Sequence, residues 1–586
     1  MKCVIVILAS VPLLMINACG PGNRGGGDDF GNGDGNGSCN MHMCSADLHD
    51  VVDCNGAVIE TCASDLGCAG GACVDPCQAA ASETSSVGCD YYAVNPDSYL
   101  TTNGSCYAAY IANTWSTPVA INVEFNGQQL DTSTFARVPV GAGSSITYQP
   151  LMGGMLMPNQ VAILFLAYHQ GLLTTACPAG ITPAYVAGDA AVHGTALGHG
   201  FHITTTAPVV AYDIFPYGGG NSAVTSATLL LPTSAWDTNY VAVDAYEQAH
   251  VLDDMGQVSN ASPPFIEITA MQDATHVTVK PTVAIVGGTG VAAAAAGSNA
   301  QYTLAKGQVL QFTQNAELNG SVITSDVPVG LWGGHTCMNV PNPVVACDAA
   351  HQQIPPVQAM GHRYAAVRYR NRFANIEESP PWRLVGGVDG TTLTYKPSQP
   401  AGAPSTLAQG QTAMFNSPGQ FTVESQDADH PFYMAGYMTG CQQINDGSDC
   451  RGDPEYVNVV PPDQFLKAYT FFTDPTYPET NLVLTRERDG GQFADVTIDC
   501  IGTVTGWQPI DASDQTEYAR VDLVTGNFQG VGSCNNGLHV ASSSNKFGLV
   551  VWGWGSKASG LFSSTYVSYA YPAGASLKHI NHVVIE

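Results

Sequence analysis

Basic residues are scarce in this sequence. The chain has 19 Lys and Arg against 48 Asp and Glu, which gives a formal net charge of −29. Phosphate binding needs clustered Lys and Arg, so this balance excludes a nucleic-acid partner and opposes binding to anionic lipid surfaces. Charged residues of both signs make up only 11% of the chain and apolar residues 45%, so the chain can bury large cores.

Long apolar runs are scarce as well. Beyond the first residues no stretch reaches the roughly 18 consecutive apolar residues that a membrane helix needs. The nearest candidate, Val161–Leu173, is interrupted by Tyr168, His169 and Gln170. The opening run Val4–Ile16 is too short to span a bilayer and has the length of a signal-peptide core. We therefore expect no membrane-spanning helix.

A lipid-attachment motif ends that opening run. The residues Ile16-Asn17-Ala18-Cys19 resemble a bacterial lipobox, in which the Cys is lipidated and becomes the new N-terminus. Asn17 departs from the usual small residue, and an ordinary signal peptide that contains a Cys is the alternative. We predict that residues 1–18 are removed and that lipid on Cys19 anchors the exported chain to the cell envelope, at the outer membrane or cell surface. The Gly-rich residues 19–38 predict a flexible tether.

Catalytic signatures are absent from the sequence. It has no Gly-x-Ser-x-Gly elbow, no His-Glu-x-x-His motif and no phosphate loop. The adjacent acids Asp253-Asp254 and Glu377-Glu378 point to opposite faces of a strand, so neither forms an acid–base pair, and we expect them in solvated turns. We predict no catalytic residue and no cofactor, and that the protein is not an enzyme.

Cysteines, by contrast, are numerous: the chain has 18. Without Cys3 in the removed peptide and the lipidated Cys19 an even number remains, which in an exported chain predicts disulfides. Residues 39–87 predict a small disulfide module with a hairpin at Asp53–Val58. Its cysteines are Cys39, Cys44, Cys54, Cys62, Cys68, Cys73 and Cys77. Their odd number requires one more partner, for which Cys89 is the candidate, and the pairing within the module stays open.

Four disulfides are predicted beyond the module. The pairs are Cys106–Cys177, Cys337–Cys347, Cys441–Cys450 and Cys500–Cys534. Around Cys337 and Cys347 lie His335, Asp348 and His351, which are also metal-ligand types, so zinc is the alternative there. Their spacing matches no standard zinc finger. We predict a disulfide and no metal site.

Short β-rich runs separated by Gly, Asn, Asp and Pro turns fill the chain from Gly88 onward. Ala120–Phe125 and Thr275–Val279 alternate with period two, as half-buried strands do. A terminal strand recurs at spacings of 120, 103 and 116 residues. Its copies are Pro208–Tyr212, Pro328–Trp332, Pro431–Ala435 and Phe547–Trp552. Another strand precedes each copy, at His202–Thr204, Val322–Thr324, Phe421–Val423 and Leu538–Val540.

This repeat predicts four units of about six strands in about 110 residues each, the size of one β-sandwich. The units cover about residues 88–230, 231–355, 356–460 and 461–586. The proline pairs Pro355-Pro356 and Pro461-Pro462 mark stops between units. We predict an all-β fold of tandem antiparallel β-sandwich-like repeats. A closed β-propeller is the alternative, because it too stacks short antiparallel strands.

Several blocks of the sequence resemble one known family. The blocks are Gly88–Val94, Ser325–Cys337, Ala346–Asp348, Gln353–Pro356, Gly452–Pro454 and Pro461–Phe465. Together they resemble the N-terminal domain of IgGFc-binding protein and its bacterial relatives, from residue 88 to the C-terminus. The resemblance implies an extracellular binding domain on a bacterial lipoprotein. It does not transfer the antibody ligand to this chain, because one fold serves many ligands.

A surface binding or adhesion protein is the function that these features predict, with loops that meet an extracellular protein or glycan. Lipid supplies its only membrane contact. The ligand-binding residues remain unknown. Two other classes stay open: an enzyme on surface polysaccharide or peptide without a recognisable motif, and a structural component of the envelope.

Tryptophans and one tripeptide are the sequence leads to a ligand site. Exposed tryptophans could stack on sugars or anchor a protein partner, and the candidates are Trp382, Trp507, Trp552 and Trp554. Trp332 and Trp552, inside repeat strands, are expected in the core. Trp115 and Trp554, near turns, are expected to be more open. The integrin-type tripeptide Arg451-Gly452-Asp453 is explained by the family motif that contains it.

Overall fold

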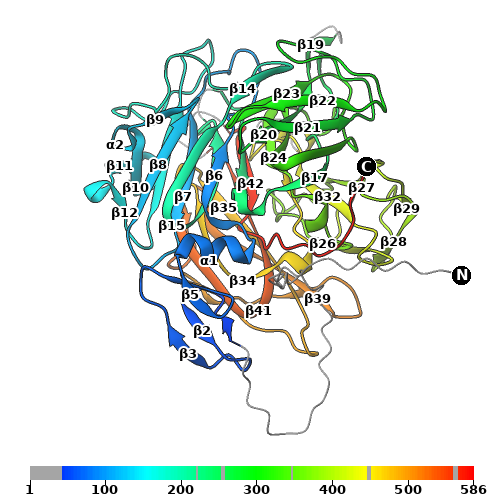
Figure 1. The fold of residues 1–586 in the computed structure, drawn as a ribbon. Coiled ribbons are helices and arrows are strands. Elements are labelled where there is room, and N and C mark those ends of the chain that lie inside the picture. The colour runs from blue at the N-terminus through cyan, green and yellow to red at the C-terminus, as the bar shows by residue number, and fades with distance from the viewer. Residues whose placement is uncertain are drawn as a thin grey trace, which may run out of the picture. The chain divides into compact units, whose positions relative to one another are not determined.

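Antiparallel β-sheet dominates the structure, with 47% strand and 6% helix (Figure 1). The computed structural model describes residues 42–219, 222–252, 258–342, 344, 347–444, 450–557 and 565–586, and only the backbone of 250–252 and 258–260. The predicted signal peptide, Cys19, the tether and Asp253-Asp254 lie outside the described residues. No helix in the described ranges is long and apolar enough to cross a membrane. The predicted all-β class is confirmed.

The N-terminal module consists of two small sheets and one helix. Its elements are β1 (Met43–Cys44), β2 (Asp50–Val52), β3 (Val58–Thr61), β4 (Gly67–Ala69), β5 (Ala72–Val74) and α1 (Pro76–Glu83). The predicted hairpin forms, because β2 pairs with β3 around a turn in which the Asp53 N–H donates to the Ala57 carbonyl at 2.8 Å. Helix α1 begins where Asp75 caps the N–H groups of Cys77 and Gln78 and Pro76 takes the first turn.

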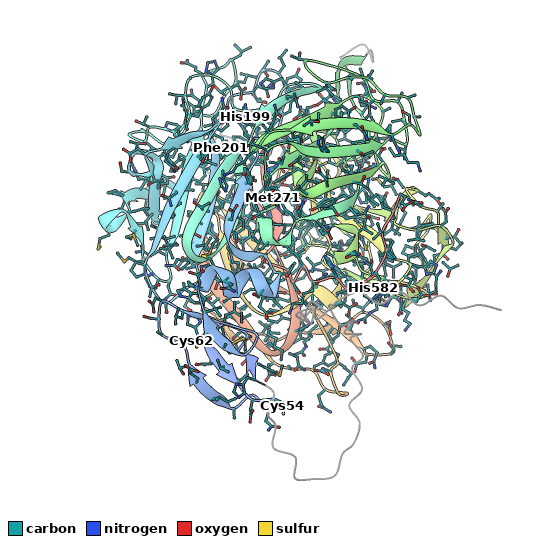
Figure 2. The ribbon with its side chains drawn as sticks, viewed as in Figure 1. Cys54, Cys62, His199, Phe201, Met271 and His582 are labelled. Carbon is teal, nitrogen blue, oxygen red and sulfur yellow. A yellow bond between two sulfur atoms is a disulfide. The ribbon has the colours of Figure 1, made fainter. Side chains whose placement is uncertain are left out.

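Disulfides hold this module together and tie it to the next sheet. The bridges are Cys44–Cys68, Cys62–Cys73 and Cys77–Cys89, and Cys54 is disulfide-bonded as well. Figure 2 shows Cys54 and Cys62 in this module. Cys89 lies beyond it and is the extra partner that the count of cysteines requires. Because such a small module buries little apolar surface, the bridges supply much of its stability.

The first large sheet has ten strands. They are β6 (Val87–Ala93), β7 (Tyr107–Asn113), β8 (Val119–Phe125), β9 (Gln128–Leu130), β10 (Ala136–Val140), β11 (Thr147–Pro150), β12 (Met155–Leu156), β13 (Val161–Ala167), β15 (Phe201–Phe215) and β16 (Ser226–Leu229). Its loops hold α2 (Thr132–Phe135) and the 3-10 helices η1 (Gly143–Ser145) and η2 (Met152–Gly154). Every residue of β13 is buried, so the longest internal apolar run is a central strand.

The second large sheet has eight strands. They are β14 (Ala196–His199), β17 (Asp237–Val241), β20 (Pro264–Ala270), β21 (Thr275–Lys280), β22 (Ala300–Leu304), β23 (Gln308–Thr313), β24 (Val322–Met338) and β25 (Asp348–Gln353). The separate hairpin β18 (Ala249–Leu252) with β19 (Val258–Ser262) and the 3-10 helix η3 (Thr233–Ala235) belong to the same stretch. In β21 buried and exposed residues alternate, as the sequence pattern predicts. Figure 2 labels His199 on β14 and Phe201 on β15, where the chain passes from the second sheet to the first.

Two four-stranded sheets follow and pack on the aromatic core around Trp382 and Phe421. Their strands are β26 (Arg363–Ala366), β27 (Pro381–Gly386), β28 (Thr391–Lys396), β29 (Thr406–Leu407), β30 (Thr412–Asn416), β31 (Phe421–Ser425), β32 (Phe432–Met438) and β33 (Glu455–Asn458). The 3-10 helices η4 (Val357–Ala359) and η5 (Cys441–Gln443) flank them. Two facing antiparallel sheets over one core make this unit a β-sandwich.

The last sheet has nine strands. They are β34 (Leu466–Thr473), β35 (Glu479–Glu487), β36 (Val496–Ile498), β37 (Gly502–Thr503), β38 (Gln508–Pro509), β39 (Thr516–Thr525), β40 (Gln529–Gly530), β41 (Gly537–Trp554) and β42 (Ser568–Pro572), after the 3-10 helix η6 (Pro462–Gln464). Three of the 3-10 helices open a stretch of strands directly after a proline, namely η3 after Pro232, η4 after Pro356 and η6 after Pro461. The two proline pairs therefore lie at stops between sheets.

The repeated strand pairs seen in the sequence form long bent strands. In β15, residues 201–205 pair with β8 and residues 209–214 with β7, so one strand serves two layers. Strands β24 and β41 do the same, because each half pairs with different partners. In the third unit the bend is a loop, and the two halves are the separate strands β31 and β32. Three of the units are thus two-layer sandwiches around one bent strand, and in the third unit two consecutive strands take its place.

A tyrosine fixes the bend in every unit. Its hydroxyl donates to the backbone carbonyl just after the bend, in the pairs Tyr91–Val209, Tyr240–Val329, Tyr364–Phe432 and Tyr469–Phe547. Three of the four hydroxyls also accept a backbone N–H from their own loop. All four tyrosines are buried. A buried hydroxyl that satisfies two backbone groups holds the strand and the loop together.

The last strand of each unit lies at a common axis. Strand β16 contacts β25 and β42, and β33 contacts β25 and β42, so the four strands close a cycle. The hydrogen bonds at this axis mainly join a side chain to a backbone group: the His351 backbone N–H donates to the Ser226 hydroxyl at 2.9 Å, and the Thr225 hydroxyl donates to the Ser568 carbonyl at 2.6 Å. The units are therefore sandwiches, as predicted, and they also close on themselves as the propeller alternative requires.

Residues next to the first and last sheets complete the closure. The Ser86 N–H donates to the Ala575 carbonyl at 2.8 Å, and the Leu577 N–H donates to the Thr84 carbonyl at 2.8 Å. The chain then continues along the third and second units, where Asn581 donates to the Val357 carbonyl at 2.8 Å. Segments separated by most of the chain thus meet edge to edge.

Candidate functional site

Two loops from opposite ends of the chain face each other across a groove of about 830 Å³. One loop, residues 141–145, joins β10 to β11; the other, residues 527–536, lies between β39 and β41 and includes β40. We call the space between them the loop groove. Its lining residues are Gly141, Ala142, Gly143, Ser144, Ser145, Asn527, Phe528, Gln529, Asn535 and Asn536. The volume lies within the roughly 300–1,000 Å³ typical of small-molecule sites.

The first loop is held by its glycines and by one backbone bond. Gly141 and Gly143 have φ of 89° and 55°, conformations that favour glycine. The Gly143 N–H donates to the Pro475 carbonyl at 2.8 Å, which fixes the loop to the last unit. Ser145 turns its hydroxyl back to the Ala142 carbonyl, whereas the exposed Ser144 hydroxyl has no partner among the described residues.

A covalent bridge and a constrained aromatic residue hold the second loop. The Cys500–Cys534 disulfide fixes its later part. Phe528 has φ of 55°, which is rare for a residue with a bulky side chain, and its ring packs against Gly143, where an added Cβ would lie 3.1 Å from the ring. The side chains of Asn527 and Asn535 are exposed and have no partner within the described ranges.

The groove differs from two other hollows in the described part of the chain. A cavity between the third and fourth units, with Trp382 and Trp552 in its wall, holds only about 40 Å³. That is room for a few waters at most, so it is a gap in packing between units. A hollow of about 280 Å³ near Arg488 and Lys546 is lined largely by charged residues. The loop groove has no charged residue in its lining.

The cysteines named from the sequence outside the module all form bridges. The disulfides are Cys106–Cys177, Cys337–Cys347, Cys441–Cys450 and Cys500–Cys534. These are the pairings expected from the sequence. Their number indicates an exported protein, because the cytosol keeps thiols reduced.

The residues considered as zinc ligands in the sequence are drawn apart by other partners. Cys337 and Cys347 are bridged, His335 bonds the Glu247 carbonyl at 3.1 Å, and His351 bonds Asp213 at 2.5 Å. Burial lowers the pKa of His335 to about 3, so its ring is neutral. The bridged Cys337 and Cys347 therefore offer no thiolate to a zinc ion.

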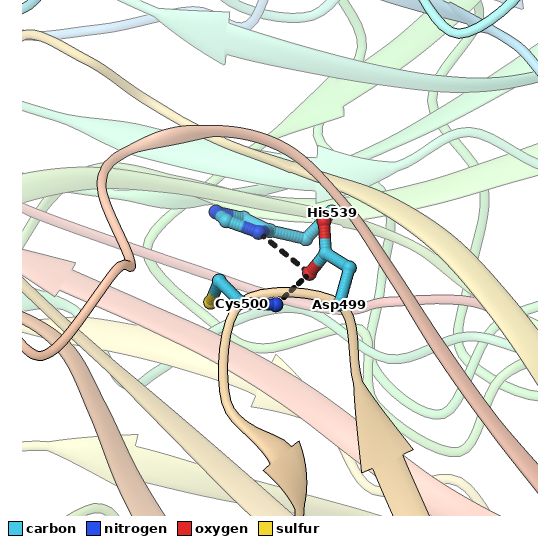
Figure 3. Close-up of side chains that lie close together, drawn as sticks. All are labelled: Asp499, Cys500 and His539. Atoms are coloured by element: carbon cyan, nitrogen blue, oxygen red, sulfur yellow. Dashed lines mark hydrogen bonds and ion pairs between the residues drawn. The ribbon is translucent and has the colours of Figure 1, made fainter.

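One group of metal-ligand types does converge, at Asp499, Cys500 and His539 (Figure 3). His539 Nδ1 lies 3.0 Å from Asp499 Oδ1, and its Nε2 lies 2.7 Å from the Asn535 carbonyl. The Cys500 sulfur is bonded to Cys534 and is not a thiolate. Both ring nitrogens are engaged, so the cluster acts as a brace beneath the 527–536 loop.

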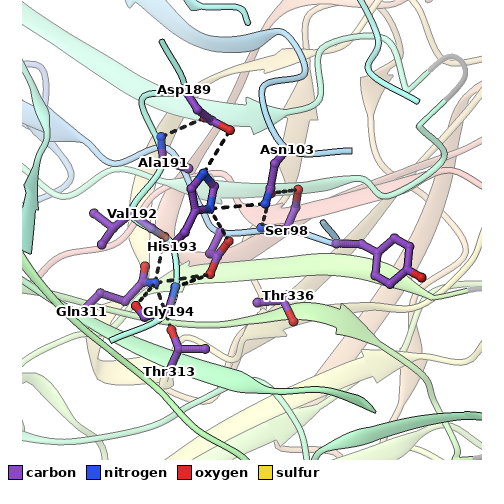
Figure 4. Close-up of polar contacts among 12 residues, drawn as sticks. Ser98, Asn103, Asp189, Ala191, Val192, His193, Gly194, Gln311, Thr313 and Thr336 are labelled. Atoms are coloured by element: carbon purple, nitrogen blue, oxygen red, sulfur yellow. Dashed lines mark hydrogen bonds and ion pairs between the residues drawn. The ribbon is translucent and has the colours of Figure 1, made fainter. Parts of the chain in front are cut away.

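A second histidine cluster lies between the first and second sheets (Figure 4). His193 Nδ1 is 2.8 Å from Asp97 Oδ1 and its Nε2 is 3.1 Å from Asp189 Oδ2. The bonds to Asp189 and Asp97 raise the pKa of His193 to about 10, so the ring is charged at neutral pH. Gln311 donates to the Val192 and Gly194 carbonyls, both at 2.8 Å. Both ring nitrogens of His193 hold this segment in place, so the cluster has a structural role.

Buried acids gather at the axis. Asp348, Asp453 and Glu455 are each fully buried. Burial raises the pKa of Asp453 to about 8 and raises the pKa values of Asp348 and Glu455 well above their usual range. None of the three lines the loop groove. Raised pKa values are a mark of catalytic acids, but these carboxyls lie in the interior, beneath the surface.

The predictions for the tryptophans are confirmed for two residues and wrong for two others. Trp332 and Trp552 are buried in the core, as expected. Trp115 and Trp554, expected to be open, are 4% and 0% exposed. The Trp115 indole donates to the Ser64 carbonyl at 3.0 Å, and the Trp554 indole donates to Glu479 at 3.1 Å beneath Arg370. Residues distant in the sequence cover both rings, so the prediction of open tryptophans was wrong.

The remaining residues singled out in the sequence are mostly buried as well. Trp382 is buried, and Trp507 is half-buried beneath Arg486. Glu378, expected in a solvated turn, is buried and paired with Arg372 at 2.8 Å, while Glu377 is exposed. The two neighbours do point to opposite sides. Asp453 of the integrin-type tripeptide accepts the Cys441 N–H at 3.0 Å in the interior and is not displayed.

Sequence reasoning missed the loop groove altogether. Its residues are Gly, Ser, Asn and Gln, which are common in any turn. The local signal was a pair of glycine-rich, amide- and hydroxyl-bearing turns. Only closure of the chain brings the 141–145 turn beside the 527–536 turn, and a sequence does not state that closure.

Two comparisons with known proteins bear on this chain. A family model described as IgGFc binding protein matches residues 226–553, more than half of the chain. The match begins at the first residue of β16 and ends within β41, so it omits residues 88–225, which the resemblance in the sequence includes. No curated protein matches the sequence.

Proposed function

Because the chain belongs to the IgGFc-binding protein family, we propose that it is a lipid-anchored cell-surface binding or adhesion protein that recognises an extracellular protein or glycan. The loop groove is the observation that carries this proposal. It is concave, its walls are fixed by a disulfide and by backbone bonds, and its free amides and hydroxyl face no partner of their own. Rigid walls with free polar groups suit binding, because little order is lost when a ligand enters.

The chain's architecture supports a role outside the cell. Disulfides hold the module and each of the four later units, and lipid on Cys19 would place the whole array at a membrane surface. The family name refers to antibody Fc. For this chain antibody Fc is one of several candidate ligands to be tested.

We expect no catalysis from this protein. The groove lining offers amides, hydroxyls and one aromatic ring, and it contains no acid, base or thiol nucleophile. The strongly shifted carboxyls Asp348, Asp453 and Glu455 lie in the interior. An enzyme acting on surface polysaccharide or peptide would instead need titratable groups that converge on an open cleft.

A binding screen tests the proposal. The purified full-length protein is presented to a glycan array and to a panel of extracellular proteins that includes antibody Fc. We expect a saturable hit that Asn527→Ala weakens and that Asn299→Ala, an exposed amide outside the groove, leaves unchanged. Absence of any hit, or a hit that both variants leave intact, contradicts the groove as the ligand site. Concentration-dependent self-association without a hit would favour the structural envelope role.

A further inference from the structure

We propose that the loop groove binds an uncharged, hydroxyl-rich ligand, namely a neutral oligosaccharide; this inference rests on the binding function proposed above. The first argument is charge. Of the ten residues in the lining, none is Asp, Glu, Lys, Arg or His. A site for phosphate, sulfate, carboxylate or a basic peptide would need an opposite charge, because charge-assisted bonds carry most of that recognition.

Hydrogen-bonding capacity is the second argument. The exposed Asn527 and Asn535 amides each offer two N–H donors and one carbonyl acceptor, and the Ser144 hydroxyl can do both. The Gln529 amide donates to the Asn527 carbonyl at 3.0 Å, which leaves its own oxygen free to accept. Sugar hydroxyls also donate and accept at once, so neighbouring hydroxyls match such amides in pairs.

An aromatic ring adds apolar surface to the groove. Phe528 is half-buried in the lining and is held in place by Gly143. A glycine is favoured opposite the ring, because its φ is positive and a Cβ there would lie 3.1–3.2 Å from three ring atoms. The C–H faces of a sugar ring are apolar, and an aromatic side chain supplies the matching surface among polar groups.

Preorganisation is the fourth argument. Asn536 is already fixed, since it donates to the Tyr477 carbonyl at 2.8 Å and accepts from Thr480 at 2.7 Å. Its neighbour Asn535 follows the bridged Cys534 directly. The free amides therefore stand on anchored backbone, and a weakly binding neutral ligand loses little affinity to loop ordering.

A protein ligand fits this groove less well. Protein interfaces take their binding energy from buried Trp, Tyr and Arg anchors over roughly 1,200–2,000 Å². The lining has none of these residue types, and the tryptophans that were candidates for such anchors are buried or half-buried elsewhere. The small, polar and neutral lining matches a sugar chain better.

The experiment compares neutral with charged glycans on the full-length protein. Arrays of neutral oligosaccharides, and of sialylated, sulfated and uronic-acid oligosaccharides, are probed at low and high salt. We expect binding to neutral oligosaccharides that changes less than about twofold between 50 and 500 mM NaCl, because an uncharged site is not screened. A preference for acidic glycans, or affinity that falls steeply with salt, overturns the inference.

Variants locate the site. Asn527→Ala should lower the affinity about three- to tenfold, as expected for one or two neutral hydrogen bonds. Asn527→Asp keeps the shape and removes both N–H donors, so it should lower the affinity by a similar factor without disturbing the loop. Asn299→Ala is the matched control. Equal affinity in Asn527→Asp and the parent protein overturns the inference even if the Ala variant misfolds.

The same panel separates this inference from the broader proposal. If Fc or another protein binds through the groove, with affinity lost in Asn527→Ala, the binding function stands and the oligosaccharide inference fails. If neutral glycans bind and the groove variants bind equally well, the glycan site lies elsewhere and this inference also fails. If nothing binds, both fail together.

Discussion

Asp453 shows how one residue reports on the interior of this fold. Its carboxyl accepts the Cys441 N–H at 3.0 Å, and burial raises its pKa to about 8 in spite of that bond and of the Arg372 guanidinium. Asp348 is likewise raised by burial first, and then by the charges of Asp453 and Glu455. These acids favour the protonated form when folded and the ionised form when unfolded.

This difference predicts that acid stabilises the fold. Between the ordinary Asp pKa of about 3.8 and about 8, the folded Asp453 retains a proton that the unfolded chain has lost. The free energy of unfolding therefore falls as pH rises through this window, by about 1.4 kcal/mol per pH unit for each such carboxyl. Asp453→Asn keeps the acceptor for Cys441 and should flatten the slope, as measured by thermal unfolding from pH 4.5 to 9.

The exposed Asp495 supplies the control. Asp495→Asn should leave the pH slope of the parent protein unchanged. If Asp453→Asn has the same slope as the parent, the Asp453 carboxyl is ionised in the folded protein and the account of the axis is wrong.

The bonding and burial of a single residue could be predicted from the sequence only where they depend on residues close to it in the chain. Cys337 and Cys347 lie ten positions apart and bridge within one unit. Trp554 was misjudged because Arg370 and Glu479, which cover it, come from distant positions. Burial of Asp453 likewise depends on strands of other units. A turn in the sequence gives no sign that another unit will cover it.

At the scale of elements, the feature that all four units share is a buried tyrosine whose hydroxyl binds the backbone at the bend. Strand pairs were visible in the sequence because their period-two pattern is local. Their fusion into one bent strand was not visible, since a bend and a turn share the same residues. The four tyrosines also escaped notice: each lies more than 60 residues before the carbonyl it binds.

Removing one of these hydroxyls tests its weight. Tyr364→Phe leaves both the Phe432 carbonyl and the Gly361 N–H without their buried partner. We expect a loss of about 1–3 kcal/mol in the free energy of unfolding, measured in urea. Tyr168→Phe is the control, because the Tyr168 hydroxyl has no partner among the described residues. Equal stability of the two variants would mean that the bend holds without its tyrosine.

At the scale of the whole molecule, the sequence suggested an exported array tied to a membrane by its first residues. The all-β class and the disulfides were predictable, because composition and cysteine spacing are properties of the chain itself. Closure at the axis and the loop groove were not, because both arise from contacts between units that no local pattern encodes.

The proposed lipid anchor is directly testable. Cys19→Ala should move the protein from the detergent phase to the aqueous phase in a phase-partition experiment, because lipid would be its only membrane contact. Substituting Cys54, a bridged cysteine of the module, is the control and should leave partitioning unchanged. Recovery of Cys19→Ala in the detergent phase would disprove the anchor.

The contact between the first and last units also determines when the fold can be completed during synthesis. Ser86 and Ala575 are 489 positions apart and bond directly. During synthesis residue 86 emerges long before residue 575, so the Thr84 carbonyl and the Ser86 N–H beside the first sheet stay without these partners until the end of the chain is made. Unpaired edges invite aggregation. Completion of this fold is therefore a late event, and a chain interrupted before residue 575 would lack the contacts that join its first and last units.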